Sequence, residues 1–375
     1  MRVLIAPDKF KGSLSAAEVA HCLARGLAAA GAHPIELPLA DGGDGSVAAA
    51  IRAGYTAHTV TVAGATGLPH RARIAVSGGA QDTRTALVEI ADTCGLATLP
   101  GGRLSALDAS SLGFGQAVRQ ALRHRPARLV LALGGSASTD GGLGLLTALG
   151  IRGLDAAGLP LYPCGRALSA LARIDASSAI ELRGVELVVA SDVTNPLTSP
   201  RGAAHVFGPQ KGASDSEVTL LDRGLSHLVK VLAKSGFPQA QALAAAPGAG
   251  SAGGIGFAAT LLGAQLISGA EFFLDLLDFD THAARADLVI TGEGSLDDQS
   301  AHGKLPTVIA GRAAPIPVIA VAGRSTLPRN HWSTAGFTQV HALADSTALD
   351  TSRNRPLTEL LLERMGHQIA DTYRR

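Results

Sequence analysis

Aromatic and charged residues are both scarce in this chain of 375 residues, and each shortage narrows what the protein can do. Aromatic residues make up 3% of the sequence, so few side chains are present on which bases or sugar rings could stack. Charged residues account for 17%, and the net charge is only +1. Nucleic acids and anionic membranes attract proteins that carry a basic excess. The composition therefore argues against both kinds of partner.

Cysteine is also rare, with three widely spaced residues at Cys22, Cys94 and Cys164. This number and spacing argue against a disulfide framework or a structural zinc site, and they predict a reducing compartment, the cytoplasm. No signal peptide is recognisable at the N-terminus. Residues 237–270 carry no charged side chain, but Pro247 and several glycines interrupt them. We expect a buried glycine-rich loop that leads into a core helix there, not a transmembrane helix.

Apolar residues, at 46% of the chain, are abundant enough to form a large core, and their spacing predicts parallel strands at both ends of the sequence. Residues 2–7 and 34–40 are expected to be strands on either side of a helix over 15–30, which begins with Ser15 and Glu18 as a capping box. Strands are predicted again over 287–294, 317–323 and 337–343. These segments predict a flavodoxin-like, doubly wound parallel sheet in a discontinuous domain.

The middle of the chain has a different pattern. The alternating segments 58–63, 71–76 and 85–91 predict an antiparallel meander, and buried strands are expected over 128–135 and 186–193. We therefore predict an α/β protein in which residues 1–60 and 285–375 form the flavodoxin-like domain. Residues 61–284 are predicted to form an inserted mixed α/β domain, with the active site in the cleft between the two.

Polar, glycine-rich loops follow most of the predicted strands, at the end where parallel sheets bind their ligands. Only six lysines occur in the chain, and four of them, Lys9, Lys11, Lys211 and Lys304, lie in glycine-containing loops. Lysine carries a compact charge that suits phosphate oxygens, and the alternative for each lysine taken alone is a solvated loop residue. The loops also contain the carboxylates Asp8, Asp41, Asp44, Asp140, Asp192, Glu293, Asp297 and Asp298. Such residues either hold a divalent cation or form turns beside glycine.

Two glycine-rich segments are candidates for binding phosphate. Residues 134–142 (GGSASTDGG) precede an apolar helix and could form an anion cradle or a simple helix start capped by Ser138, Thr139 or Asp140. Residues 248–254 contain the spacing G-x-G-x-x-G, but they follow an alanine-rich helical segment and Pro247 instead of a strand. A dinucleotide-binding fingerprint is therefore not supported there. The sequence has no Walker A motif.

Seven segments, in order along most of the chain, resemble bacterial class I glycerate kinases, the glycerate 2-kinase family. They are APDKFKGSLSA (6–16), PLADGGDGS (38–46), LGGSASTDGG (133–142), SDVTNPL (191–197), GPQKGA (208–213), GAGSAGGIGFA (248–258) and TGEGSLDDQSAHGK (291–304). The resemblance implies a discontinuous two-domain α/β fold. It also implies phosphorylation of D-glycerate with ATP and Mg²⁺, usually to 2-phosphoglycerate, with 3-phosphoglycerate as the alternative product. Whether the protein forms a homodimer is left open.

Within that frame, the loop residues receive expected roles. Asp192 is the candidate general base, and Lys9 and Lys211 are candidate catalytic cations, with Lys211 neutralising developing charge. Lys9, Lys11 and Ser13 suit the substrate carboxylate or the transferring phosphoryl group, and Asp41 and Asn195 are further substrate-binding candidates. The nucleotide phosphates are assigned to Gly134, Gly135, Ser136 and Ser138, and the metal to Glu293 and Asp297. Two alternatives are an oxidoreductase that binds a dinucleotide near Gly248 and a small-molecule sensor.

Overall fold

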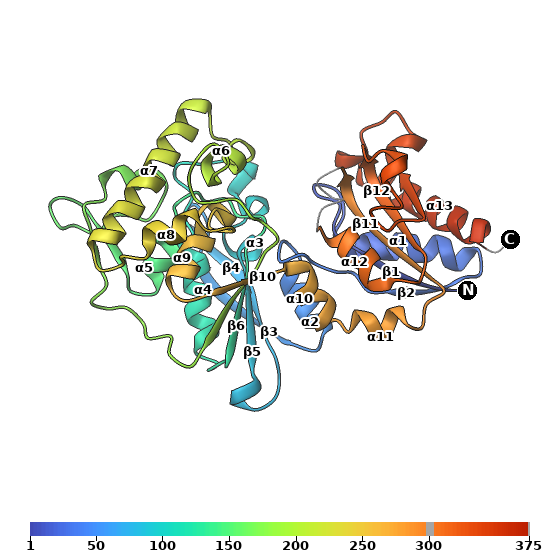
Figure 1. Cartoon of the computed structure of the whole chain (residues 1–375), viewed down its shortest axis with the longest axis horizontal. Coiled ribbons are helices and arrows are strands. Elements are labelled where there is room, and N and C mark those ends of the chain that lie inside the picture. The colour runs from blue at the N-terminus through green and yellow to red at the C-terminus, as the bar shows by residue number, and fades with distance from the viewer. Residues whose placement is uncertain (298–303, 374–375) are drawn as a thin grey trace. The chain divides into compact units, whose positions relative to one another are not determined.

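The computed structural model describes residues 1–297 and 304–373, which fold into two compact units (Figure 1). Unit 1 combines residues 1–41 with the described residues from 270 onwards, and unit 2 comprises residues 42–269. The division is discontinuous, as the sequence predicts. However, the chain passes between the units at 41/42 and 269/270, earlier at both points than the expected boundaries at 60/61 and 284/285.

Unit 1 is built on a five-stranded sheet in which every pair of neighbouring strands is parallel. The strands lie in the order β13-β12-β11-β1-β2, which corresponds to 2-1-3-4-5 along the chain, the order of flavodoxin-like sheets. The elements of this unit are β1 (Arg2–Pro7), α1 (Ala16–Ala29), β2 (His33–Glu36), α11 (Phe279–Ala283), β11 (Leu288–Leu296), α12 (Leu305–Ala313), β12 (Val318–Ser325), β13 (Gln339–Ala342) and α13 (Arg355–Tyr373).

Strand β2 ends at Glu36, earlier than the predicted end at residue 40. The chain nevertheless continues beside β1, since the amide of Leu37 donates to the carbonyl of Ile5 and that of Leu39 to the carbonyl of Pro7. This extension carries the chain to Asp41 at the carboxyl end of β1.

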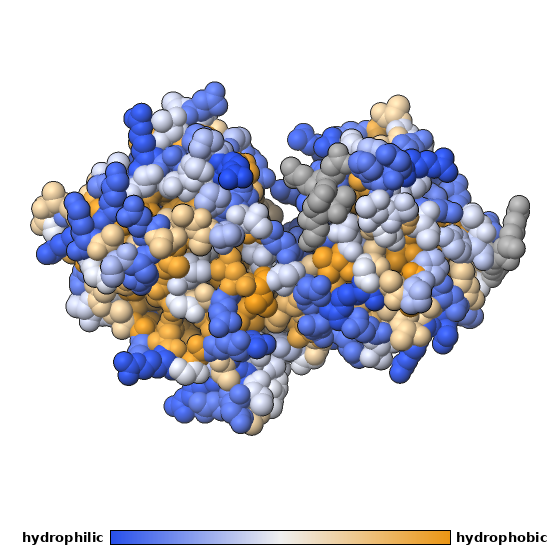
Figure 2. Space-filling view, in the orientation of Figure 1, coloured by the Kyte–Doolittle hydropathy of each residue, from blue (hydrophilic) through white to orange (hydrophobic). Residues whose placement is uncertain are grey.

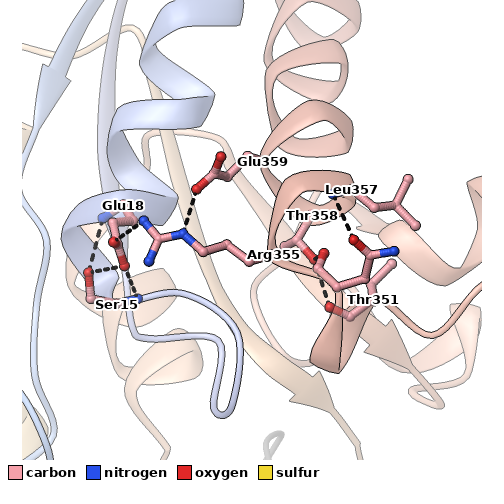
Figure 3. A network of polar contacts seen from close by, with 8 residues as sticks. Ser15, Glu18, Thr351, Arg355, Leu357, Thr358 and Glu359 are labelled. Atoms are coloured by element: carbon pink, nitrogen blue, oxygen red, sulfur yellow. Dashed lines mark hydrogen bonds and ion pairs between the residues drawn. The ribbon is translucent and has the colours of Figure 1, made fainter.

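Helices α1 and α13 pack together to form much of the core of unit 1 (Figure 1). Helix α1 begins at the predicted capping box, in which the Ser15 hydroxyl accepts from the Glu18 amide and Glu18 accepts from the Ser15 amide. Arg355 on α13 donates to Glu18 at 2.6 Å and to Glu359 on its own helix at 2.8 Å (Figure 3). The start of α1, and with it the loop that follows β1, is thus tied to α13.

Unit 2 contains a six-stranded mixed sheet in the order β10-β9-β6-β5-β4-β3. The strands β3, β4 and β5 are antiparallel neighbours, which confirms the predicted meander, and β5, β6, β9 and β10 are parallel. The strands are β3 (Thr56–Ala63), β4 (Pro69–Val76), β5 (Thr85–Glu89), β6 (Arg128–Ala132), β9 (Glu186–Ala190) and β10 (Gln265–Ile267), and a separate hairpin is formed by β7 (Arg152–Leu154) and β8 (Arg173–Asp175).

The first boundary differs from the prediction because β3 is the edge strand of this sheet and pairs with β4 over its whole length, from Thr56 to Ala63. The segment that leads to β3, including α2 (Ser46–Arg52), therefore belongs to unit 2. Near the second boundary, α10 (Gly269–Leu276) begins on the last residue of unit 2.

The remaining helices of unit 2 surround its sheet with apolar side chains and form a single large core. They are α3 (Ile90–Cys94), α4 (Leu112–Leu122), α5 (Leu143–Ala148), α6 (Ala203–Phe207), α7 (Asp215–Lys234), α8 (Ala240–Ala245) and α9 (Ile255–Leu261). Hydrophilic side chains cover much of the visible surface of each unit (Figure 2). Within residues 1–297 and 304–373, no helix combines the length and apolar character needed to cross a lipid bilayer.

The contact between α1 and α13 leaves no room for a side chain at Gly26, and this yields a first prediction. A Cβ atom at Gly26 would collide with the backbone carbonyl of Glu363 on α13. Gly26→Ala should therefore lower the free energy of unfolding by about 1–3 kcal/mol, because the two helices must move apart. Unfolding can be followed by the fluorescence of the single tryptophan, Trp332, which lies in the same unit.

Gly311→Ala is the matched control, because Gly311 lies on α12 with no atom within 4 Å of the added Cβ. There, the better helix propensity of alanine should leave stability unchanged or raise it by up to about 1 kcal/mol. Equal stability of the two variants would contradict the proposed contact.

Candidate active site

Charged side chains gather at the carboxyl end of β1 in unit 1. The ammonium group of Lys9 lies 3.5 Å from Asp8 Oδ1 and 3.7 Å from Asp41 Oδ1. Asp8 is 9% exposed, and Glu293 on the neighbouring strand β11 is close enough to influence its charge. The structure therefore brings together three of the predicted residues, Lys9, Asp41 and Glu293. It adds Asp8, a loop carboxylate to which sequence analysis gave no role.

The carboxyl group of Asp8 is held in an environment that disfavours its charge. Burial, together with the negative charges of Asp41 and Glu293, raises its pKa to about 7, although Lys9 acts in the opposite direction. A cation placed among these carboxylates would relieve their repulsion. In residues 1–297 and 304–373, however, His, Cys, Asp and Glu side chains form no group of three or more that is arranged to hold a metal ion.

The loop between β1 and α1 contains the other two predicted substrate residues of unit 1, Lys11 and Ser13. Gly12 between them has a φ of +85°, a left-handed conformation that favours glycine. The side chain of Lys11 is exposed, and its backbone N lies against Gly294 of β11. The hydroxyl oxygen of Ser13 is buried and has no hydrogen-bond partner among the residues that the structure describes.

The second predicted metal ligand, Asp297, follows the end of β11, and its Oδ1 lies 3.7 Å from the ammonium group of Lys304. Both side chains are about 40% exposed. The part of the 291–304 motif between them, which includes Asp298, lies outside the described residues. Asp297 therefore has a defined partner in Lys304.

In unit 2, the predicted phosphate loop and Lys211 come together after β6. Lys211 is 2% exposed, and its ammonium group donates to Ser136 Oγ at 3.0 Å and to the backbone carbonyl of Ser138. The hydroxyls of Ser138 and Thr139 are buried and, within the described chain, have no hydrogen-bond partner. Gly135, with a φ of +83°, allows the turn that leads from the strand into this loop.

The environment of Lys211 disfavours a positive charge. Burial lowers the pKa of this lysine to about 7, and the negative charge of Asp140 opposes the shift only in part. An anion beside the ammonium group would favour its protonated form. The loop therefore has two properties of an anion site, a cation that is costly to bury alone and polar hydroxyls without partners.

Asp140 in the same loop has a structural role. The sequence analysis proposed it only as one of three possible caps for the following helix. It is fully buried and accepts hydrogen bonds from the Ser111 amide at 2.8 Å and the Ser111 hydroxyl at 2.7 Å. It also accepts from the amides of Gly142 and Gly144 at the start of α5, whose N-cap is Gly142. Asp140 thus joins the starts of α4 and α5, and burial raises its pKa.

The candidate base Asp192 lies just beyond the end of β9, the strand beside β6. Its Oδ1 accepts hydrogen bonds from the Ser268 hydroxyl at 2.9 Å and from the Gly269 amide at 3.0 Å. The side chain of Asn195 donates to the carbonyl of Arg201 at 2.8 Å, so this amide helps to close its own loop. Both residues follow the same strand, as predicted.

The glycine-rich segment 248–254 packs between the two loops just described. A Cβ atom at Gly250 would collide with the carbonyl of Pro196, and one at Gly253 would collide with the carbonyl of Ser138. The Gly250 amide donates to the carbonyl of Asn195 at 2.9 Å, and the Gly141 amide donates to that of Gly253, also at 2.9 Å. The glycines Gly250 and Gly253 are therefore required by close backbone packing.

Sequence analysis missed Glu89, which is 3% exposed at the end of β5. Its two carboxylate oxygens accept from the amides of Gly45 and Val47, at 3.0 and 2.8 Å. Alternation along 85–91 gave no sign of this role. The available signal was a carboxylate at the end of an otherwise apolar strand.

The two units carry different kinds of polar and charged groups at the ends of their strands. Unit 1 offers ammonium groups and carboxylates at the ends of β1 and β11, and unit 2 offers a buried cation, backbone amides and a carboxylate at the ends of β6 and β9. Such groups suit anionic, hydroxyl-bearing molecules and the transfer of a phosphoryl group, which depends on positioning and charge neutralisation.

Comparison with known proteins confirms the family. A model of the glycerate kinase family matches residues 3–374. The glycerate kinase of Bacillus subtilis is 42% identical over 86% of this chain and 85% of its own length. The glycerate 2-kinase of Escherichia coli is 40% identical over 87% of this chain and 86% of its own.

A solved structure shows the same architecture. A crystal structure of a Salmonella typhimurium LT2 protein, provisionally named glycerate kinase 2, is 36% identical and superposes with a TM-score of 0.76. The match covers 100% of this chain and 98% of that one. This chain therefore belongs to the glycerate kinase family and is a phosphotransferase.

Proposed function

We propose that this protein transfers the terminal phosphoryl group of ATP to D-glycerate and forms 2-phosphoglycerate. The observation that carries the proposal is the buried ammonium group of Lys211 in the glycine-rich loop after β6, in a chain of the glycerate kinase family. The name of the Escherichia coli relative, glycerate 2-kinase, favours the 2-hydroxyl as the acceptor.

The nucleotide phosphates bind to the loop formed by Gly134, Gly135, Ser136 and Ser138. Backbone amides and hydroxyls in such loops are suitable donors to phosphate oxygens. The Ser138 hydroxyl, which has no partner among the described residues, and the lowered pKa of Lys211 both support an anion at this place, because the anion would accept from the hydroxyl and favour the charged lysine. Lys211 then neutralises the charge that develops on the phosphoryl group.

Glycerate carries one carboxylate and two hydroxyls, and unit 1 supplies matching groups. Lys9 and Lys11 provide positive charge, Ser13 provides a buried hydroxyl, and Asp41 can accept a hydrogen bond from a substrate hydroxyl. Asn195 in unit 2 is a further substrate-binding candidate. Asp192 acts as the general base and takes the proton from the hydroxyl that attacks phosphorus.

Mg²⁺ is the cation that this reaction requires, and the residues of unit 1 fit its preference for oxygen ligands. Glu293 and Asp297 are the proposed ligands, and Asp8 adds a further carboxylate near Glu293. Because Mg²⁺ is usually held by one or two carboxylates together with substrate phosphates, a preformed cluster of three is not needed. When bound, the ion neutralises charge on the phosphate oxygens.

The three cysteines are free thiols, which suits the reducing cytoplasm.

The proposed reaction can be tested with the purified protein, ATP, Mg²⁺ and D-glycerate. We expect ADP to form only when D-glycerate is present, and ³¹P NMR should show 2-phosphoglycerate as the product. Formation of 3-phosphoglycerate would correct the position of transfer. If ADP does not depend on glycerate, the proposed substrate is wrong.

Asp192→Asn separates a catalytic role from a purely structural one. The asparagine oxygen can still accept from Ser268 and Gly269, so the fold should be retained while the basic carboxylate is lost. Because Asp192 is the proposed general base, Asp192→Asn should lower kcat by about 10²–10⁴ with little change in ATP affinity. The control is Asp155→Asn, since Asp155 also accepts two backbone amides but lies on an exposed turn. If Asp192→Asn keeps the kcat of this control, Asp192 only anchors the loop.

The lowered pKa of Lys211 predicts that nucleotide binding takes up a proton. At about pH 8, this lysine is mostly neutral in the free protein, and an adjacent phosphate favours the charged form and so raises the pKa. Calorimetric titration with ADP in buffers of different ionisation enthalpy should therefore show proton uptake, and affinity should weaken as the pH rises above 7. Lys211→Met should abolish the uptake, whereas Lys230→Met, on the exposed face of α7, should retain it. Equal uptake in both variants would remove Lys211 from the nucleotide site.

A further inference from the structure

Glu89 is a buried carboxylate that the proposed reaction does not use. It is the last residue of β5, its side chain is almost fully buried, and it lies beside Ala132 at the end of β6. Both oxygens accept hydrogen bonds from backbone amides, one from Gly45 and one from Val47. The carboxylate thus binds the segment that runs into α2.

The segment that Glu89 holds is the turn 42–46, whose conformation depends on this acceptor. Gly45, the N-cap of α2, has a φ of +102° and no side chain that could accept a hydrogen bond from the helix. Glu89 supplies that acceptor from the neighbouring strand. Within the turn, the Ser46 hydroxyl donates to the carbonyl of Gly43 at 2.6 Å, which closes it further.

The other side of the turn lies against the proposed nucleotide loop. The Gly134 amide donates to the carbonyl of Gly42 at 3.0 Å. A Cβ atom on Gly134 would come within 2.5 Å of the Cα of Gly43, so the two backbones are in direct contact. The position of Gly134 therefore depends on the turn, and the turn depends on Glu89.

Burying an ionised carboxylate at this place lowers the stability of the folded protein. Burial, with a smaller contribution from the nearby negative charges of Asp44 and Asp92, raises the pKa of Glu89 to about 7, although the two backbone amides oppose the shift. A charge that costs stability and yet orders a functional loop is better explained by positioning than by folding.

We propose that Glu89 is a positioning residue that fixes the turn 42–46 and, through it, the nucleotide loop that begins at Gly134. This inference rests on the proposed assignment of nucleotide phosphates to residues 134–138. It predicts that loss of the carboxylate weakens nucleotide binding without removing any group that touches the reacting atoms.

Glu89→Gln tests the proposal, because its amide can accept from only one of the two backbone N–H groups and presents its own N–H to the other. We expect the Kd for ADP, measured by calorimetry, and the KM for ATP to rise roughly 10-fold, and kcat to stay within about 3-fold. Hydrogen exchange of the amides in 42–47 should become faster. Glu89→Asp retains the charge but is too short to reach both amides, and it should show the same changes in ADP affinity if the glutamine variant does not fold.

Glu217→Gln is the matched control. Glu217 also accepts a backbone amide at a helix start, that of Ser214 at 2.8 Å, but it does so at the exposed N-terminus of α7. This variant should lower the melting temperature with less than about a 2-fold change in ADP affinity. If Glu89→Gln binds ADP as tightly as Glu217→Gln, the positioning role is wrong and the kinase assignment stands. If the wild-type protein binds no ADP, the nucleotide loop itself is wrong, and the role of Glu89 falls with it.

Discussion

Backbone-to-backbone packing at the carboxyl end of the six-stranded sheet determines the geometry of the candidate site in unit 2. Gly42 lies against the carbonyl of Ala190, Gly134 against Gly43, and Gly253 against the carbonyl of Ser138, each with no space for a Cβ atom. Four segments that are far apart in the sequence are thus held together without intervening side chains. This packing explains why glycine occupies these positions in the polar loops that follow the strands.

A few charged side chains are buried near the proposed site in one unit or the other, and burial makes their charges costly. Burial raises the pKa of Asp8 and Glu89 to about 7 and lowers that of Lys211 to about 7, so each group resists the charge it would carry in water. A cation near Asp8 or an anion near Lys211 would restore the favoured charge. Ligands that do so bind the folded protein only, and they therefore stabilise it. The buried groups of the proposed site therefore lower the stability of the empty protein and favour the binding of charged ligands.

Much of the fold could be predicted because its signals are local. The capping box at Ser15 and Glu18 and the apolar strands of both sheets depend on neighbouring residues alone. The unit boundaries depend instead on distant pairing, since residues 42–63 join unit 2 through the contact of β3 with β4. Nothing in the composition of the short segment before β3 distinguishes it from unit 1.

The candidate site shows the same division between local and distant information. Polar, glycine-containing loops pointed to Lys9, Lys211 and Asp192 as candidates, but not to Glu89, whose partners lie more than forty residues away in the sequence. Asp192, just after β9, accepts hydrogen bonds from Ser268 and Gly269, where the chain leaves unit 2. Gly42, where the chain enters unit 2, packs against Ala190, the last residue of β9. The end of β9 thus carries both the candidate base and the anchors of both connections. A substitution there that alters the backbone will affect all three, so only an isosteric change of charge can isolate the chemical role of Asp192.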